Sequence, residues 1–346
     1  ERLNKMKDKK ITFLISSLNI GGAEGVCINL ANQFVKNGWV IDLIVLKFSP
    51  TTLHKKLNKD INLIILNTKN ARSSFFKLGQ YFKNSKPNKV LIFNYELTVI
   101  IVILKKLLRL KTIIITRNIN LLSFKKRDLK GIWNNLVVKP LINIFFRQSD
   151  HIINQCEAMK NDLQFVYPNI SHKLSVIYNP INVELQNFSN TINFKSVNKE
   201  DYLLCVGKLE KQKAFHYAIE GFYRINKIYP TLKLKIIGSG SLEYSLKNLA
   251  NHLGIYKKID FEGSHQNLIP YYIGAKATIL TSLYEGFPNV LLESIAIGVP
   301  VIAFDCQSGP NEIIIDGVNG FLVKYKDVND LSEKIILSLK KKWDYE

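Results

Sequence analysis

The sequence predicts an α/β protein built from two Rossmann-sized domains, and three observations support this. A length of 346 residues exceeds what one hydrophobic core usually organises and suits two domains of ordinary size. Apolar residues make up 47% of the chain and charged residues 22%, a composition that favours buried cores over disorder. Short β-branched runs also alternate with amphipathic stretches, as is typical of parallel sheets covered by helices.

In the first half, six apolar runs predict strands over residues 11–16, 40–47, 61–66, 90–93, 112–116 and 151–154. Helical patterns lie between most of them. The apolar stretch 99–110 predicts a packed amphipathic helix, because Lys105, Lys106 and Arg109 interrupt it and its uncharged part is too short to span a bilayer.

A polar stretch over residues 182–201 follows Asn179-Pro180 and predicts the linker between the domains. The alternation then resumes, with strands predicted over 202–206, 232–237, 258–262, 277–281 and 301–304. Helices are predicted over 214–228 and 242–252, after Pro288, and from Val328. We therefore expect an N-terminal domain over residues 1–181 and a C-terminal domain over residues 182–346.

The net charge of +20 lies almost entirely in the first half. Residues 1–180 hold 29 Lys and Arg against 10 Asp and Glu, a net +19, whereas residues 181–346 hold 19 against 18. This asymmetry predicts an anionic partner for the first half. No recognition helix, RRM or KH signature accompanies it, which argues against nucleic acid and favours an anionic membrane surface or a lipid diphosphate.

One basic segment is a specific candidate for that contact. It lies between Leu121-Leu122 and Trp133, and its cations are Lys125, Lys126, Arg127 and Lys130. Apolar residues beside cations suit the headgroup boundary of an anionic membrane. The alternative is a basic loop that only keeps the protein soluble.

The cysteines and histidines carry no metal signature. Four cysteines stand far apart without a CxxC pair or zinc spacing, so we expect reduced, mostly buried thiols and a cytoplasmic protein. No signal peptide precedes the first apolar run. The six histidines show no ligand spacing, and His151, inside a predicted strand, suggests a packed or hydrogen-bonded role.

Glycine-rich turns follow several of the predicted strands. Gly21-Gly22 follows the first strand and precedes a helix, an arrangement that lets backbone approach an anion. Gly238-Ser239-Gly240 ends a later strand in a similar way. The first pattern is not GxGxxG, which argues against a dinucleotide oxidoreductase. A tight structural turn explains Gly21-Gly22 equally well.

Charged residues in the second half have the spacing of a nucleotide-sugar site. Lys208 and Lys213, on one strand-to-helix loop, can place two ammonium groups around a diphosphate, although two solvated surface lysines are the alternative. Glu285 is expected in a loop and Glu293 in the second turn of the next helix. Carboxylates there accept hydrogen bonds from paired hydroxyls, while the helix N-terminus faces a phosphate. Solvated acids are the alternative for this pair.

Taken together, these segments resemble the retaining glycosyltransferases of the GT-B fold, often called family 4, in which two parallel-sheet domains face each other across a cleft. The resemblance extends over nearly the whole chain. Its motifs are Gly21-Gly22-Ala23-Glu24, Ser149-Asp150-His151-Ile152-Ile153 with Glu157 and Met159, Val176-Ile177-Tyr178-Asn179-Pro180, Val206-Gly207-Lys208-Leu209 with Lys213, Gly238-Ser239-Gly240, Phe261-Glu262-Gly263, residues 285–293, Gly298-Val299-Pro300-Val301, Ser308-Gly309-Pro310-Asn311-Glu312-Ile313 and Asp316-Gly317-Val318-Asn319-Gly320.

The resemblance implies a role for each matching residue. Lys208 and Lys213 hold the donor diphosphate, Glu293 binds the ribose hydroxyls, and Glu285 binds the donor sugar near its reacting carbon. The C-terminal domain is then the nucleotide-sugar domain and the N-terminal domain the acceptor domain. The remaining donor-binding positions are Gly22, Gly207, Gly238, Gly286, Phe287, Pro288 and Asn289.

The implied mechanism is a front-face substitution in which the departing diphosphate takes the acceptor proton. No metal or other cofactor is expected, and no Asp-x-Asp motif occurs. One departure concerns the catalytic loop, where many relatives carry His and this chain has Arg117-Asn118. Arg117 is a candidate for stabilising a phosphate or orienting the acceptor, with a surface cation as the alternative.

Within the family, the 308–310 loop and the 263–267 turn are similar to those of enzymes that extend lipid-linked oligosaccharides. The expected donor is a UDP-linked hexose or N-acetylhexosamine, and the expected acceptor is a polyprenyl-diphosphate-linked or other glycan. We expect a peripheral enzyme on the cytoplasmic face of a bacterial inner membrane. The alternatives are a GT-B sugar-nucleotide epimerase and a catalytically silent binding protein at the membrane.

Overall fold

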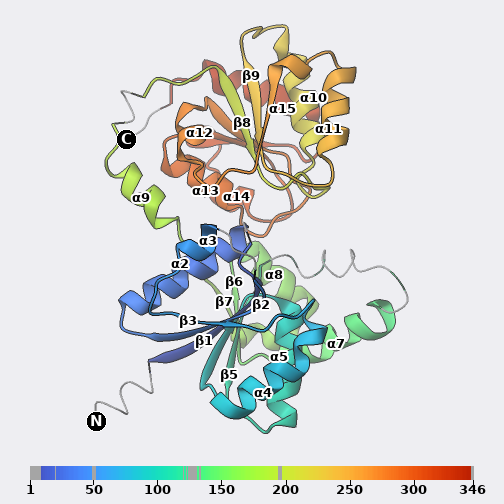
Figure 1. Ribbon diagram of the computed structural model, residues 1–346. Coiled ribbons are helices and arrows are strands. Elements are labelled where there is room, and N and C mark those ends of the chain that lie inside the picture. The colour runs from blue at the N-terminus through green and yellow to red at the C-terminus, as the bar shows by residue number, and fades with distance from the viewer. Residues whose placement is uncertain are drawn as a thin grey trace. The chain divides into compact units, whose positions relative to one another are not determined.

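The computed structural model describes residues 9–19, 21–48, 52–119, 121, 123, 131, 134–193 and 197–343. The chain divides into two compact units, Glu1–Pro180 and Ile181–Glu346. Each unit is built around one parallel sheet with helices on both of its faces (Figure 1). The predicted α/β class is therefore confirmed for both halves.

In the first unit, the described strands form a 7-stranded sheet in the order β3-β2-β1-β4-β5-β6-β7. All neighbouring pairs run parallel. The strands are β1 (Lys10–Ser17), β2 (Val40–Lys47), β3 (Asn62–Ile65), β4 (Lys89–Ile92), β5 (Ile113–Arg117), β6 (His151–Asn154) and β7 (Leu174–Val176). The sequence prediction missed β7, whose three residues are too few to show a period.

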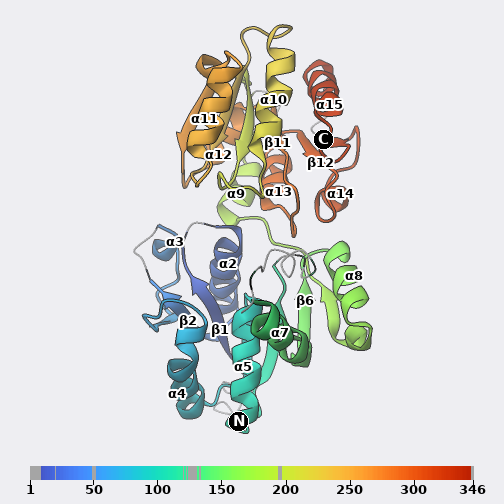
Figure 2. The same ribbon diagram turned by 90° about the vertical axis from the view of Figure 1, so that its right-hand side faces the viewer.

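Helices cover both faces of this sheet. The longer ones are α2 (Gly22–Lys36), α4 (Phe75–Ser85), α5 (Tyr95–Leu107), α7 (Lys139–Phe145) and α8 (Glu157–Val166), with α3 (Thr52–Lys55), a π-helical turn at Asn134–Val138 and 3-10 turns at Arg72–Ser74, Phe146–Gln148 and Pro168–Lys173 between them. Helix α2 buries Val26 and Ile28 against the same core as Phe13 of β1. Helices α4 and α5 pack on the opposite face (Figure 2).

Helix α5 confirms the packed helix predicted near residues 99–110. Its Leu97, Ile101 and Leu104 are buried in the core, whereas Leu107 at its end is exposed. The Asn94 side chain caps the helix by accepting a hydrogen bond from the Leu97 N–H. No helix within the described residues is long and apolar enough to cross a bilayer.

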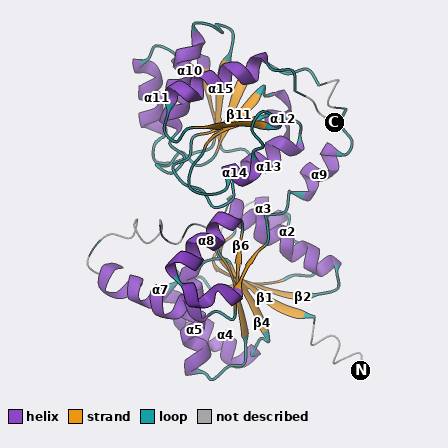
Figure 3. Cartoon of the chain, turned by 180° about the vertical axis from the view of Figure 1, so that it is seen from behind, coloured by secondary structure: helices purple, strands orange, loops and turns teal. Residues whose placement is uncertain are grey.

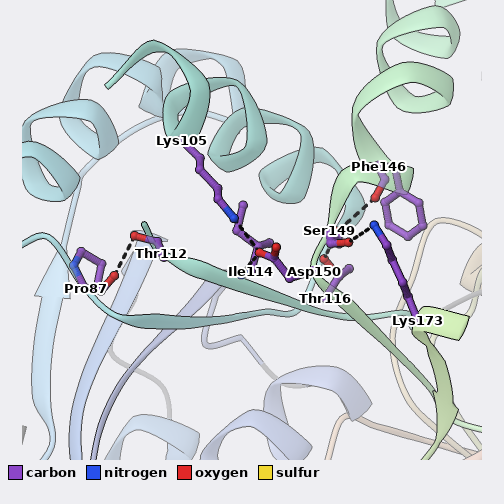
Figure 4. Close-up of polar contacts among 9 residues, drawn as sticks. All are labelled: Pro87, Lys105, Thr112, Ile114, Thr116, Phe146, Ser149, Asp150 and Lys173. Atoms are coloured by element: carbon purple, nitrogen blue, oxygen red, sulfur yellow. Dashed lines mark hydrogen bonds and ion pairs between the residues drawn. The ribbon is translucent and has the colours of Figure 1, made fainter. Parts of the chain in front are cut away.

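The Ser149-Asp150 motif joins β5 to β6 through polar contacts (Figure 4). The Asp150 carboxylate accepts hydrogen bonds from the Ile114 N–H and from Lys105, both at 2.7 Å. The buried Ser149 hydroxyl contacts Thr116 at 2.9 Å and donates to a backbone carbonyl of the preceding turn. These contacts fix the register of the two strands, so this motif has a structural role.

The second unit contains a 6-stranded sheet in the order β10-β9-β8-β11-β12-β13, again parallel throughout its described strands. Its strands are β8 (Tyr202–Val206), β9 (Lys233–Ile237), β10 (Ile259–Gly263), β11 (Ala277–Leu280), β12 (Val301–Phe304) and β13 (Gly320–Val323). Its helices are α9 (Val183–Ser189), α10 (Phe215–Asn226), α11 (Glu243–His252), α12 (Ile269–Gly274), α13 (Asn289–Ala296), α14 (Pro310–Ile313) and α15 (Val328–Lys340), with a 3-10 turn at Tyr256–Lys258.

Helices α10, α11 and α15 share one core with the sheet, and α9, α12 and α13 share another on its opposite face (Figure 3). The stretch predicted as a polar linker therefore contains a helix, α9. The Asn182 side chain caps this helix, and Leu185 buries in the core beside α12 and α13. Two apolar residues that pack on the core, Leu185 and Phe188, are too weak a pattern among polar neighbours to predict a helix.

Candidate functional site

In each sheet, strand order reverses beside the first strand of the unit. The reversal lies between β1 and β4 in the first unit and between β8 and β11 in the second. Loops leave in opposite directions at such a point, and open α/β sheets bind ligands at the carboxyl ends of the strands there. The loops that follow β8 and β11 carry Lys208, Lys213 and Glu285, so these residues flank the switch point of the second unit.

Backbone packs against backbone at this edge. Gly207 and Gly238, which follow β8 and β9, have φ angles of 155° and 142°. A Cβ atom on Gly238 would lie 1.8 Å from the Gly207 carbonyl oxygen, so only glycine fits there. The Gly207 N–H donates to the Ile237 carbonyl at 2.9 Å. The glycines thus let the two strand-ending loops meet without intervening side chains.

Lys213 and Glu285 form an ion pair at the switch point. Lys213 Nζ lies 2.6 Å from Glu285 Oε1, and their side chains are only 18% and 8% exposed. Two residues separated by 72 positions meet because each lies in a loop that leaves the carboxyl end of one of two adjacent strands, β8 and β11. Their loops are also joined directly. The Leu283 N–H donates to the Gln212 carbonyl at 2.8 Å, and Gln212 Nε2 donates to the Tyr284 carbonyl at 2.9 Å.

The loop after β12, which contains Ser308, contacts the backbone of the Glu285 loop. The buried Ser308 hydroxyl lies 2.6 Å from the Glu285 carbonyl and 3.1 Å from the Gly286 carbonyl. Gly309 has a φ of 95°, and a Cβ there would lie 2.6 Å from Pro288 Cδ. Burial, together with the nearby Glu285 charge, raises the pKa of Cys306 in this loop to about 12. The Cys306 thiol is therefore a packing group at neutral pH.

Glu293 lies in the second turn of α13, as predicted. The helix begins at Asn289, directly after its N-cap residue Pro288. Glu293 Oε2 accepts a hydrogen bond of 2.8 Å from the hydroxyl of Tyr272. Burial raises the pKa of Glu293 to about 7, and the hydrogen bond from Tyr272 opposes that rise.

Most of the other predicted site residues lie in the two loops that carry Lys213 and Glu285. Phe287 and Pro288 are buried beside Glu285, Gly286 is also buried, and Asn289 is half-buried. Lys208 is exposed on the loop after β8. Gly22 belongs to the first unit, where it is exposed in the first turn of α2. The basic residues Lys125, Lys126, Arg127 and Lys130 lie outside the described residues.

Arg117 ends β5 in the first unit and is only 3% exposed, so the surface-cation alternative for this residue is wrong. Its Nη2 donates to Asn179 Oδ1 at 2.6 Å and approaches the Ile177 carbonyl at 3.4 Å. Its Nε is buried without a hydrogen-bond partner. Burial lowers the pKa of Arg117 to about 10, which leaves the guanidinium charged at neutral pH.

Amide side chains surround this arginine at the same sheet edge. Asn179 donates to Gln155 at 3.1 Å, and Asn118 donates to Asn154 at 3.1 Å. No ion pair to Arg117 occurs among the described residues. Arg117 is therefore a buried cation near neutral amide side chains, and its Nε–H has no acceptor. Such a site is suited to binding an anion.

Two Rossmann-like units in one chain define a class of two-domain α/β enzymes, and comparison with known proteins identifies the family. The family model described as "Glycosyltransferase Family 4" matches residues 20–185, and "Glycosyl transferases group 1" matches residues 189–346. An uncharacterized glycosyltransferase of Haemophilus influenzae is 27% identical over 325 residues, which cover 93% of this chain and 88% of that protein.

A second relative has a defined reaction. It is the Campylobacter jejuni GalNAc-alpha-(1->4)-GalNAc-alpha-(1->3)-diNAcBac-PP-undecaprenol alpha-1,4-N-acetyl-D-galactosaminyltransferase, 28% identical over 345 residues that cover 95% of this chain and 89% of the enzyme. Among solved structures, Anabaena HepE in complex with UDP and glucose has a TM-score of 0.77 at 19% identity, covering 96% of this chain and 90% of that chain. The lipopolysaccharide outer core galactosyltransferase WaaB has a TM-score of 0.69 at 21% identity, covering 97% and 92%.

The chain belongs to the group 1 and family 4 glycosyltransferases, and its two units have the GT-B fold. The resemblance found in the sequence motifs is thereby confirmed. Two residues support the site in ways that the sequence did not predict. Tyr272, which contacts Glu293, lies in an apolar pattern that predicts packing alone. Ser308 was identified only as part of a family motif, and its contact with the Glu285 carbonyl was not predicted.

Proposed function

We propose that this glycosyltransferase moves a hexose or N-acetylhexosamine from a UDP-linked donor to a lipid-linked glycan acceptor, with retention of the anomeric configuration. The observation that carries the proposal is the Lys213–Glu285 pair at the switch point of the second unit. The position places a cation and a carboxylate where nucleotide ligands bind to doubly wound sheets. The name of the Campylobacter relative supports the acceptor class, and the UDP complex of HepE supports the donor nucleotide.

In this proposal the donor competes for both members of the ion pair. The diphosphate takes up the Lys213 ammonium, assisted by Lys208, and the sugar hydroxyls take up the Glu285 carboxylate. The bond between the anomeric carbon and the diphosphate oxygen breaks as the acceptor oxygen bonds on the same face. The acceptor proton passes to the departing diphosphate. The lysines stabilise the charge that develops on that leaving group, so the reaction requires no metal.

The backbone around Glu285 supplies the rest of the donor site in this proposal. Gly207, Gly238 and residues 286–289 lie at the carboxyl edge that carries the lysines, and Glu293 accepts the ribose hydroxyls. Arg117 contacts an anionic group of the acceptor, which its buried, incompletely hydrogen-bonded guanidinium supports.

The proposed acceptor also implies where the enzyme acts in the cell. A lipid-linked acceptor confines the enzyme to a membrane surface, and we place it on the cytoplasmic face of the inner membrane. The net charge of +19 in residues 1–180 supports contact with anionic lipid.

The direct test is a transfer assay with UDP-hexoses and UDP-N-acetylhexosamines and a synthetic undecaprenyl-diphosphate glycan, with the product anomer assigned by NMR. A preceding thermal-shift screen of UDP-sugars selects donors, because a bound ligand raises apparent stability. Retained configuration with acceptor-dependent UDP release is the expected result. Interconversion of UDP-sugars without acceptor would instead establish an epimerase. Binding of donor without turnover on any acceptor would indicate a silent binding protein.

A further inference from the structure

Tyr272 on α12 lies in the core of the second unit yet contacts Glu293. It is 0% exposed and belongs to the apolar cluster that contains Leu204, Val206 and Ile297. Its hydroxyl donates to Glu293 Oε2 at 2.8 Å. A buried phenol requires an acceptor, and here the acceptor is a carboxylate already placed in the site.

The hydrogen bond constrains the last torsion of the Glu293 side chain, which sets the orientation of the carboxylate. The terminal torsion of glutamate is broad and roughly two-fold, so an unsupported carboxylate samples many orientations. Among the described residues, Tyr272 makes the one hydrogen bond to the Glu293 carboxylate. Oε2 is therefore fixed by a group in the core, and Oε1 remains available to another donor.

We propose that Tyr272 is a positioning residue of the nucleotide site, which fixes the Glu293 carboxylate in the orientation that receives the two ribose hydroxyls. This inference rests on the proposed function, in which Glu293 binds ribose. Its physical basis is preorganisation. A side chain held in its bound orientation loses less conformational freedom when the ligand arrives, so each new hydrogen bond contributes more to affinity.

The neighbouring residue provides a matched control. Tyr271 lies on the same helix, but its hydroxyl is 3.1 Å from His265 Nε2 and makes no contact with Glu293. Tyr271→Phe therefore removes the same atom from the same helix without touching the carboxylate. Tyr272→Phe keeps the buried ring and removes only the hydrogen bond to Glu293.

The experiment compares UDP with 2′,3′-dideoxy-UDP by calorimetric titration of the full chain, in wild type, Tyr272→Phe, Tyr271→Phe and Glu293→Gln. We expect wild type to bind UDP roughly tenfold or more tightly than the dideoxy nucleotide, since charge-assisted hydrogen bonds are lost. In Tyr272→Phe the UDP affinity should fall roughly fivefold, while the dideoxy affinity stays at the wild-type value. Tyr271→Phe should match wild type with both ligands.

The outcomes separate the two levels of the hypothesis. Equal binding of the two nucleotides by wild type would remove the ribose role of Glu293, and with it this part of the proposed function. A normal preference for UDP in Tyr272→Phe would overturn the positioning role alone. Equal losses for both nucleotides in Tyr272→Phe would identify a structural role and also overturn it. The double variant Tyr272→Phe/Glu293→Gln should bind UDP no more weakly than Glu293→Gln, because both changes remove one coupled unit.

Discussion

At the residue scale, the Lys213–Glu285 pair has a structural role and, in the proposed function, a role in donor binding as well. Both side chains are mostly buried and lie 2.6 Å apart. Removing one partner of such a pair leaves the other charge in a poorly solvated place, which costs more than the net value of the pair. Lys208 differs, because it is exposed and its removal leaves no buried charge behind. The two lysines should therefore affect stability differently even if both bind the diphosphate.

We predict that Lys208→Ala and Lys213→Ala each weaken UDP binding roughly tenfold or more, because each removes a charge-assisted phosphate contact. Lys213→Ala should also lower the melting temperature, whereas Lys208→Ala should not. UDP titrations and thermal unfolding measure the two effects. Lys211→Ala is the control, since Lys211 is an exposed lysine of the same loop. Unchanged UDP affinity in both site variants would refute the diphosphate role.

The proposed charge neutralisation by lysine leads to a second prediction. Transfer should proceed at an undiminished rate in EDTA, because no step of the proposed reaction uses a divalent ion. The initial rate of UDP release, measured with and without chelator, tests this. Activity lost in EDTA and restored by Mg²⁺ or Mn²⁺ would contradict the metal-independent mechanism.

The raised pKa of Glu293 leads to a prediction about how UDP affinity depends on pH. Since burial raises its pKa to about 7, this carboxyl group is mostly protonated at pH 6 and mostly ionised at pH 8. The ionised form accepts hydrogen bonds from both ribose hydroxyls, so UDP affinity should rise between pH 6 and pH 8 and binding should release protons. Calorimetry in buffers of different ionisation enthalpy measures that release.

The control for this pH dependence is Glu293→Gln, which retains the contribution from titration of the UDP phosphate itself. Only the difference between wild type and variant belongs to Glu293. If the two profiles coincide, the Glu293 carboxyl does not titrate with UDP binding.

At the element scale, the carboxyl end of β5 is tied to the segment after β7 through Arg117. One nitrogen of its guanidinium contacts Asn179 and the Ile177 carbonyl, and Nε has no partner. These contacts alone would be consistent with a purely structural role, in which Arg117 links β5 to the segment after β7. Two observations favour an anion-binding role: Nε has no partner, and no carboxylate of the described residues pairs with Arg117. A purely structural arginine in a protein interior normally has all its donors satisfied.

We predict that Arg117→Lys reduces transfer at least tenfold through acceptor KM while leaving UDP affinity unchanged, since an ammonium group cannot reproduce the planar donor set. Steady-state kinetics with a varied lipid-linked acceptor and a separate UDP titration measure these quantities. Asn179→Ala is the matched variant, because it removes the partner at 2.6 Å and keeps the arginine. If both variants lose the same thermal stability and the acceptor KM stays normal, Arg117 has a structural role only.

The elements also show how far the sequence predicts this fold. Strands β2, β6, β8 and β12 have the predicted bounds, because each contains consecutive apolar residues between polar turns. Strands β7 and β13 were missed, since β7 has only three residues with a serine at its centre and β13 begins at a glycine that reads as part of a turn. Helix α9 was missed because the residues that pack on the core, Leu185 and Phe188, stand among polar residues.

The candidate site was predictable residue by residue but not as a network. The motifs identified Lys213, Glu285 and Glu293, and the strand order explains why the first two meet. Their ion pair depends on loop paths 72 residues apart, which no local pattern encodes. The role of Tyr272 could not be predicted for a different reason. In a short apolar helix a tyrosine predicts a core residue, and only the tertiary structure shows that its hydroxyl reaches Glu293.

At the scale of the whole molecule, the net charge is divided unevenly between the two halves of the chain. Residues 1–180 carry a net +19, while residues 181–346 are close to neutral. An enzyme whose acceptor is anchored in an anionic bilayer gains affinity when the acceptor half is attracted to the same surface. A general electrostatic attraction and a specific membrane-binding segment both follow from this charge, and they make different predictions.

We predict that changing Lys125, Lys126, Arg127 and Lys130 to Ser lowers binding to anionic vesicles and weakens its salt dependence, because each cation near such a surface contributes about 1 kcal/mol. Co-sedimentation with phosphatidylglycerol vesicles at low and raised salt measures the effect. The control carries four exposed lysines of the near-neutral half changed to Ser, namely Lys227, Lys257, Lys340 and Lys342. Both variants lose the same charge, so a loss confined to the first assigns binding to that segment. Equal losses in the two would favour general attraction, and no binding of wild type to anionic vesicles would defeat the membrane proposal.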